Sequence, residues 1–387
     1  MKKKALIIAN TASMILLFNR INIDILEEAG YEVHVACNFL QGNTTSKEVV
    51  EKSKMEWDKE GIAEFHIPFP RTPYSTEVFK IYKQVRALLK KEKYDIVHCH
   101  TPIVSAITKL AARGIKGTKI VHTVHGFHFF KGAPLQKWLL YFPVEKILAR
   151  MTDVMININS EDFLFAKKHL KAKKVMFIQG VGVDYEKFAC VARDKDYLRK
   201  ELGIGQDEMI AVSVGELRSV KNHMTAIRAF GECKSKNVHY VIAGIGKLRD
   251  ELMDYAKELG VGDRVHLIGF RTDVAEILRS SDFFLFPSLR EGLPVALMEA
   301  MAAGLPAIVS NTRGIRDLIS ARGGLYFEPV DHELLAKHID TFVQNKELRE
   351  KMGKHNREKV KQFDKSVIRE KLEDVLRCLE DDEERRA

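Results

Sequence analysis

Short runs rich in β-branched residues alternate along most of this chain with longer amphipathic stretches, in two successive series. Such alternation is typical of parallel sheets covered by helices. At 387 residues the chain is longer than one hydrophobic core usually organises, so the pattern predicts two doubly wound, Rossmann-like α/β domains in tandem. The predicted strands are residues 5–9, 32–36, 95–99, 119–124, 154–158 and 175–179 in the first domain, and 209–214, 238–244, 265–269, 283–287, 307–310 and 324–328 in the second.

A polar, charged segment at 184–203 separates the two series and serves as the predicted linker. We place an N-terminal domain at 1–187, a C-terminal domain at 188–364 and a terminal helix at 365–387. Open α/β sheets bind ligands beyond the carboxyl ends of their strands, so a ligand is expected in a cleft between the two domains. The terminal helix carries one apolar stripe, made of Val367, Ile368, Leu372, Val375 and Leu376.

The composition and the apolar runs of the chain are typical of a folded protein without a membrane span. A chain with 45% hydrophobic and 30% charged residues is expected to fold, and its five cysteines lack the spacing of a disulfide frame or metal site. The basic start followed by an apolar stretch imitates a signal peptide, but Asn10, Thr11 and Ser13 interrupt it, and a strand, a turn and a helix explain the same residues. No apolar run approaches the roughly 18 residues of a membrane span. We therefore expect a cytoplasmic protein.

The formal net charge of +9 is concentrated in residues 1–190. Solvated lysine faces and an anionic partner, such as a membrane surface or a phosphate-bearing acceptor, explain this excess equally well. No nucleic-acid reader motif occurs, so nucleic acid is not an expected partner.

The strongest motif lies in residues 286–310, where a buried strand leads through a loop into a helix predicted to begin near Pro294. Gly292 allows a ligand to approach the backbone closely. Unpaired N–H groups at the start of a helix bind phosphate, because they lie at its positive end. The groups in question here belong to Leu293, Val295 and Ala296.

Two carboxylates accompany this helix start. Glu291, on the loop, can accept hydrogen bonds from sugar hydroxyls. Glu299 interrupts an apolar run, and a charge there requires partners, which a ribose diol would supply. A glycosidase that uses the two groups as acid and nucleophile also fits a glutamate pair, although it leaves the phosphate-ready loops unexplained.

Glu-x7-Glu followed by Ala-x-Ala-x-Gly-x-Pro closely resembles the signature of family 4 retaining glycosyltransferases of GT-B fold, in particular enzymes of bacterial capsular and exopolysaccharide synthesis. The resemblance implies that Glu291 contacts the donor sugar and Glu299 the ribose. It also implies that the backbone of Gly292, Leu293, Pro294 and Val295 contacts the sugar and diphosphate.

Three further loops follow strands of the second domain. In the resembled family the loop corresponding to 213–223 carries an Arg directly after the Gly and a Lys five residues later, and both bind the diphosphate. Lys221 matches after Gly215, but Glu216 occupies the Arg position, so Arg218 is the expected substitute. Gly244 is expected in a tight turn near the diphosphate. By the resemblance, the loop of Gly269, Phe270 and Arg271 holds the nucleobase.

In the first domain, His125 directly follows a strand and precedes Gly126. The family carries a histidine here beside the reacting sugar, and we transfer this role to His125, with His122 and His128 as alternatives. His98 and His100 end another strand and resemble the wall of the family's cleft, although packing explains them as well.

Residues 126–143 combine aromatic side chains with two lysines, which suits either a membrane interface or a core. A lipid-linked acceptor would require a membrane interface. The residues concerned are Phe127, Phe129, Phe130, Trp138, Tyr141 and Phe142, with Lys131 and Lys137.

Together these features predict transfer of a hexose or N-acetylhexosamine from a nucleotide-diphosphate sugar, by the family's habit a UDP-sugar, to a lipid-linked glycan at the inner face of a membrane. The resemblance implies retention of anomeric configuration. No metal or cofactor is expected, because Lys221, Arg218 and helix ends can balance the departing charge, and Asp194 and Asp196 lie in the linker. A sugar-nucleotide epimerase of GT-B architecture and a non-catalytic glycosyltransferase-like subunit remain alternatives.

Overall fold

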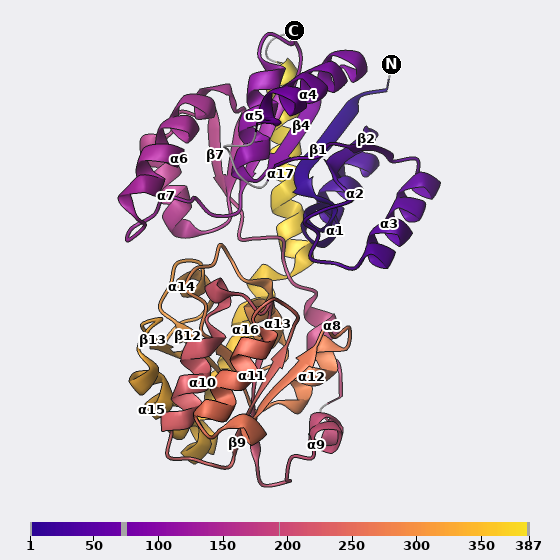
Figure 1. Cartoon of the computed structure of the whole chain (residues 1–387). Helices are drawn as coiled ribbons and strands as arrows, with labels where there is room; N and C mark the ends of the chain where they lie inside the picture. Colours follow the sequence, from indigo (N-terminus) through magenta and orange to yellow (C-terminus); the bar gives the residue numbers. More distant parts are fainter. Residues whose placement is uncertain (1, 71–75, 193, 385–387) are drawn as a thin grey trace. The chain divides into compact units, whose positions relative to one another are not determined.

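The computed structural model describes residues 2–70, 76–192 and 194–384 and divides into two compact units (Figure 1). The first unit contains Met1–Val181 together with the chain from Ile368 onward, and the second contains Gly182–Val367. The sequence placed the boundary at 187/188 and treated the last helix as a separate element. In the structure this helix belongs to the core of the first unit.

The first unit is built on a seven-stranded parallel sheet of order β3-β2-β1-β4-β5-β6-β7. Side chains of the central strand alternate between two hydrophobic clusters, with Ile7 in one and Leu6 and Ile8 in the other, so both faces of the sheet are covered. The strands are β1 (Lys4–Thr11), β2 (Glu32–Asn38), β3 (Ala63–His66), β4 (Ile96–His100), β5 (Lys119–Val124), β6 (Val154–Asn157) and β7 (Lys174–Phe177).

Helices connect these strands, because parallel neighbours require crossover connections. They are α1 (Ala12–Phe18), α2 (Arg20–Glu28), α3 (Lys47–Glu60), α4 (Val78–Glu92), α5 (Pro102–Ala112), α6 (Leu135–Leu148), the short η1 (Ala149–Met151) and α7 (Ser160–His169). Since Ala5 to Ala9 are fully buried in the central strand, the apolar start of the chain forms part of the core.

The second unit contains a six-stranded parallel sheet of order β10-β9-β8-β11-β12-β13. Its strands are β8 (Met209–Val214), β9 (Val238–Ala243), β10 (Val265–Gly269), β11 (Phe283–Phe286), β12 (Ala307–Ser310) and β13 (Gly324–Phe327). Its helices are α8 (Tyr185–Ala189), α9 (Asp196–Leu202), η2 (Ser219–Lys221), α10 (His223–Glu232), α11 (Arg249–Glu258), η3 (Gly262–Arg264), α12 (Val274–Ser280), α13 (Val295–Ala302), α14 (Ile315–Leu318), α15 (His332–Gln344), α16 (Lys346–Lys359) and η4 (Val360–Phe363).

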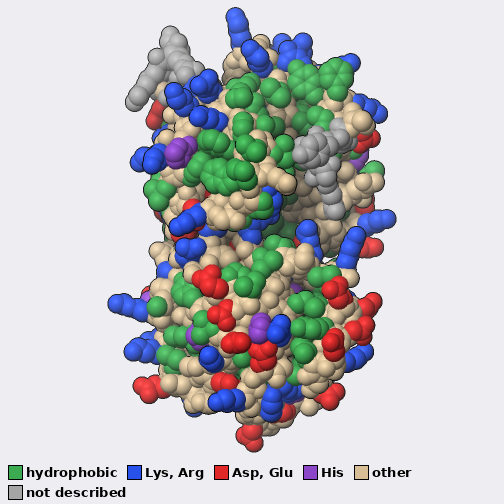
Figure 2. Space-filling view, turned by 60° about the vertical axis from the view of Figure 1, so that its left-hand side comes forward, with side chains coloured by type: hydrophobic (Ala, Val, Ile, Leu, Met, Phe, Trp, Pro, Cys, Tyr) green, Lys and Arg blue, Asp and Glu red, His purple; other side chains and the backbone are tan. Residues whose placement is uncertain are grey.

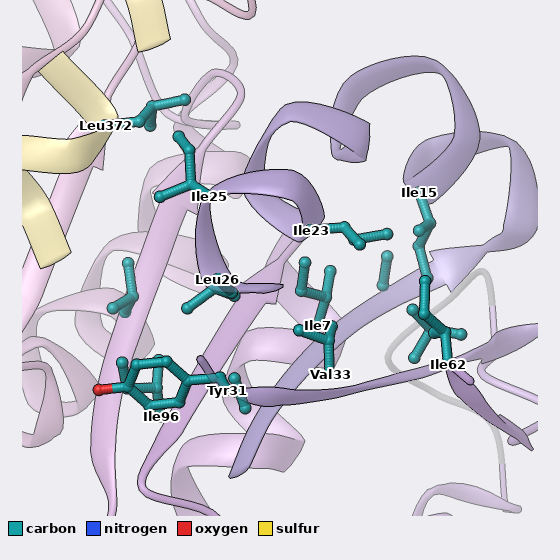
Figure 3. Close-up of a cluster of buried hydrophobic side chains, with 14 of the residues drawn as sticks. Ile7, Ile15, Ile23, Ile25, Leu26, Tyr31, Val33, Ile62, Ile96 and Leu372 are labelled. Carbon is teal, nitrogen blue, oxygen red and sulfur yellow. The ribbon is translucent and has the colours of Figure 1, made fainter. Parts of the chain in front are cut away.

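The terminal helix α17 (Lys365–Glu384) buries four residues of its predicted apolar stripe in the first unit, namely Ile368, Leu372, Val375 and Leu376. Ile368, Leu372 and Val375 are buried in the cluster that contains Ile7 and Ile25, and Figure 3 shows Leu372 beside Ile25. Removing one such aliphatic side chain from water contributes roughly 1.5–3 kcal/mol, which explains why this helix belongs to the N-terminal core.

All twelve predicted strands are present, and strand β3 is the one the sequence did not reveal. Its four residues, AEFH, lie at the sheet edge, where half-buried and exposed residues alternate, so they lack the apolar run of a buried strand. Within the described ranges, no helix is both long enough and apolar enough to span a membrane.

Candidate functional site

The loop after β11 and the start of α13 form the best-defined candidate site in the second unit. Strand β11 is buried along its whole length, and Pro294 caps the helix that begins at Val295. The N–H groups of Leu293, Val295 and Ala296 donate no hydrogen bond to any described group. The structure thus provides the set of free donors that the sequence predicted, at the positive end of an eight-residue helix.

Lys221 and Glu291 meet beside this helix start. Lys221 Nζ lies 2.8 Å from Glu291 Oε1, and both side chains are largely buried. The ammonium also lies 5.3 Å from the centre of the Phe286 ring, in a cation–π position. Lys221 comes from η2 and Glu291 from a loop 70 residues later, so the fold unites two residues that sequence analysis proposed separately.

Glu299 lies in the middle of α13 as an unpartnered carboxylate. It is partly buried, and no described side chain forms a hydrogen bond or ion pair with it. Burial raises the pKa of Glu299 to about 7, and the weaker attraction of Lys187 and Lys365 opposes this shift. A half-buried carboxylate without a hydrogen-bond partner is typical of a residue whose partner is a bound ligand.

Two positions of this region require glycine because another backbone segment approaches them closely. A Cβ on Gly244 would lie 1.8 Å from the carbonyl oxygen of Gly215, and a Cβ on Gly314 would lie 2.0 Å from that of Gly292. Gly314 also has a φ of +75°, which disfavours other residues. Sequence analysis missed Gly314, whose only signal was its place soon after a strand. A side chain at this position would displace the loop that carries Gly292.

Arg218 stands apart from the Lys221 and Glu291 pair. Its side chain is 64% exposed, and its guanidinium lies 3.3 Å from Glu216, the residue at the family's Arg position. The expected substitution of Arg218 for that Arg therefore stays a prediction. It requires the Glu216 contact to open.

The loop after β10 presents Phe270 and encloses Arg271. Gly269 has a φ of +74° and bridges to Gly244, so the loops after β9 and β10 lie side by side. Phe270 is exposed. The guanidinium of Arg271 is occupied by Glu201 and Asp273, at 2.5 Å each, and these carboxylates raise its pKa. The donor-binding roles expected of Phe270 and Arg271 both stay predictions, and that of Arg271 requires these ion pairs to open.

His125 lies at the carboxyl end of β5 in the first unit, beside His100 from β4. His125 Nε2 is 3.1 Å from His100 Nδ1, and burial lowers the pKa of His125 to about 4. Both rings line a small pocket of the first unit with Phe18, Asn19 and Gly180. A neutral imidazole at this sheet edge can exchange hydrogen bonds with a ligand.

The two alternative histidines occupy other surroundings. His122 is buried, and its Nδ1 lies 2.8 Å from the buried ammonium of Lys109, which is 3.9 Å from Glu145. The ring of His128 lies tilted against that of Tyr141, with ring centroids 4.7 Å apart. His125 is the one of the three that lines the pocket.

The aromatic residues of 126–143 mainly build a core. Phe127 and Phe129 are buried, and Trp138, Tyr141 and Phe142 pack against them. Helix α6, which begins in this region and ends at Leu148, carries exposed apolar side chains. Among them are Leu135, Leu139 and Ile147, which are 71%, 69% and 64% exposed.

Side-chain clusters bear on metal binding. In the part of the chain that the structure describes, no group of three or more His, Cys, Asp or Glu side chains could hold a metal ion. The expectation that transfer needs no metal stays a prediction.

Comparison with known proteins places these loops in a family. Residues 24–162 match the profile described as glycosyltransferase family 4, and residues 194–359 match that of glycosyl transferases group 1. A putative glycosyltransferase of Bacillus subtilis, EpsD, is 35% identical over 356 residues, which cover 90% of each chain. The chain belongs to glycosyltransferase family 4.

Other relatives agree with this family assignment. An Escherichia coli UDP-Gal:alpha-D-GlcNAc-diphosphoundecaprenol alpha-1,3-galactosyltransferase is 37% identical over 239 residues, 60% of this chain and 62% of the relative. The crystal structure of Anabaena HepE in complex with UDP has a TM-score of 0.76 at 18% identity, over 96% of this chain and 99% of that one. The predicted GT-B architecture of two Rossmann-like domains is confirmed.

Proposed function

We propose that this family 4 glycosyltransferase transfers a hexose or N-acetylhexosamine from a UDP-sugar to a lipid-linked glycan during synthesis of a bacterial surface polysaccharide. The observation that carries the proposal is the Lys221–Glu291 pair at the free N-terminus of α13. A cation, a carboxylate and free amides in one place match a sugar joined to a diphosphate. Glu299, one turn further along the helix, matches the ribose.

Each group has a distinct task in this scheme. Lys221 and the amides of Leu293, Val295 and Ala296 stabilise charge on the departing diphosphate. Glu291 accepts hydrogen bonds from hydroxyls of the transferred sugar and keeps Lys221 in place between turnovers. Ionised Glu299 accepts two hydrogen bonds from the ribose diol. Arg218, once released from Glu216, adds a second cation.

The proposed chemistry retains anomeric configuration. The bond between the anomeric carbon and the phosphate oxygen breaks, and a bond from that carbon to the acceptor oxygen forms on the same face. The acceptor's proton passes to the leaving phosphate, so no enzyme nucleophile and no metal is needed. His125 contributes from the first unit as a hydrogen-bond donor to an oxygen of the reacting sugar.

The lipid-linked acceptor is supported by relatives and by one surface. The name of the Escherichia coli relative specifies a diphosphoundecaprenol acceptor, as does that of a Campylobacter jejuni relative 27% identical over 222 residues. In Figure 2, which brings the α6 side forward, apolar areas of the first unit are bordered by Lys and Arg side chains. Leu135, Leu139 and Ile147 on α6 lie in a segment with Lys131 and Lys146.

We propose that this α6 surface rests on the inner face of the membrane. Leu135→Gln/Leu139→Gln/Ile147→Gln should reduce binding to phosphatidylglycerol vesicles at least fivefold in a flotation assay. Val49→Gln/Met55→Gln, which changes exposed apolar residues of α3, is the matched control. Equal vesicle binding by both variants would contradict the membrane role of α6.

A transfer assay tests the proposed reaction. Each of a panel of labelled UDP-hexoses and UDP-N-acetylhexosamines is incubated with the full chain and N-acetylglucosaminyl-diphosphoundecaprenol, and label in the lipid phase is measured. Transfer from one donor supports the proposal. Epimerised donor without transfer supports the epimerase alternative, and UDP binding without turnover supports a non-catalytic subunit; either would overturn it.

A further inference from the structure

A chain of histidines connects the interior of the first unit to His125. His98 Nε2 lies 2.8 Å from Thr123 Oγ1, and the rings of His98 and His100 are 4.3 Å apart. His100 is fully buried, and its Nδ1 lies 3.1 Å from Nε2 of the partly exposed His125. His125 has no other hydrogen bond with the described residues, so His100 supplies the hydrogen bond that orients its ring.

The other nitrogen of His100 constrains the direction of this hydrogen bond. His100 Nε2 is buried without a hydrogen-bond partner. Burial lowers the pKa of His100 and of His125, so at neutral pH both rings are neutral and each carries one proton. If His125 donated, the proton of His100 would sit on Nε2 as a buried N–H without an acceptor, which proteins rarely tolerate. If His100 donates from Nδ1, its buried Nε2 carries no hydrogen and leaves only a lone pair without a partner.

The backbone next to His100 is strained. Thr101 has a φ of +68° and a ψ of 144°, a region that residues with a Cβ rarely adopt, at a cost of about 1–3 kcal/mol. It stands between His100 and Pro102, the first residue of α5. Strain kept at the carboxyl end of a strand, beside the pocket that His100 and His125 line, indicates a geometry maintained for function.

We propose that His100 is a positioning residue, which donates its Nδ1–H to His125 Nε2 and thereby holds the proton of His125 on Nδ1. His125 then presents an N–H donor, and not a lone pair, to an oxygen of the reacting sugar. This inference rests on the proposed function, because it specifies how His125 takes part in that reaction.

The tautomer can be read directly, without activity. Long-range 1H–15N spectra of the full chain with 15N-labelled histidine, at pH 7.5, distinguish the two neutral forms, and His125→Gln identifies the signals by their loss. The proposal expects His125 protonated on Nδ1 in the unmodified chain. Protonation on Nε2 would overturn it, whatever the outcome of the transfer assay. A missing transfer activity with the Nδ1 tautomer present would overturn only the proposed function.

Variants separate positioning from packing. His100→Ala should lower kcat about 10- to 100-fold with little change in the donor KM, because a misplaced group affects the reacting geometry more than binding. His100→Asn, whose amide can donate in place of Nδ1, should recover activity to within about threefold. His98→Asn, the same change two residues earlier, should leave the His125 tautomer unchanged. Equal losses from all three variants would overturn the positioning role.

Discussion

Replacing Glu299 by glutamine should stabilise the protein without ligand while weakening its binding of nucleotide. Burial raises the pKa of Glu299 from 4.5 to about 7, because no described side chain forms a hydrogen bond or ion pair with it and the attraction of Lys187 and Lys365 offsets only part of the shift. Between pH 4.5 and about pH 7, Glu299 keeps its proton in the folded chain and has lost it in the unfolded chain. Folding stability therefore falls as the pH rises through this window, and above it the ionised group costs up to about 3 kcal/mol.

Glutamine never ionises, so Glu299→Gln should remove this cost. Partial exposure of the side chain reduces the expected gain to about 1–3 kcal/mol at pH 8, with almost none at pH 4.5. For a unit of this size that corresponds to a rise of roughly 2–12 °C in Tm at pH 8. Thermal unfolding followed by circular dichroism at both pH values measures it.

The matched control is Glu276→Gln, which changes an exposed carboxylate on α12 of the same unit. It should leave Tm unchanged at both pH values. With saturating UDP the unmodified chain should have a higher Tm than Glu299→Gln, since ionised Glu299 gains two hydrogen bonds from the ribose. A Glu299→Gln variant that is no more stable than the unmodified chain at pH 8, or is equally stabilised at pH 4.5, would refute the reasoning.

Other predictions address the rest of the site. Lys221→Gln should lower kcat about 100-fold, as the loss of one donor to a developing charge does, and steady-state transfer kinetics check it. Glu291→Ala should impair turnover while UDP affinity, measured by calorimetry, changes little; equal losses of both would contradict its contact with the sugar. Gly314→Ala should destabilise the chain by about 1–3 kcal/mol and weaken UDP binding, because its Cβ would displace Gly292. Added EDTA should leave transfer intact, and an activity abolished by EDTA and restored by Mn²⁺ would rule out the metal-free mechanism.

Much of the fold was predictable because its strands are buried on both faces. Such strands appear as continuous apolar runs, as FFLF of β11 does, and their order along the chain implies parallel sheets. Strand β3 was not predicted, because an edge strand with half its residues exposed carries no such run. The stripe of α17 was visible in the sequence, but which core it covers depends on tertiary packing, which no local pattern encodes.

The site was predictable where a motif is local and not where it depends on the approach of distant segments. Glu299 and the amides of Leu293 and Val295 follow from a strand, a glycine and a helix start. The pairing of Lys221 with Glu291, and the contact of Gly314 with Gly292, join segments far apart in sequence. The ion pair of Arg271 with Glu201 could not be foreseen either, because nothing in a sequence shows which charges from distant segments meet.

The central claim is that the donor's nucleotide diphosphate binds at α13 through Lys221 and Glu299. Calorimetric titration of the full chain with UDP at pH 8 tests it most directly, with Lys221→Gln, Glu299→Gln and Glu276→Gln measured alongside. The account predicts that UDP binds the unmodified chain and the Glu276→Gln control equally, and binds each of the other two variants about tenfold or more weakly, a loss of at least ~1.4 kcal/mol. Unchanged UDP affinity in Lys221→Gln and Glu299→Gln would contradict it.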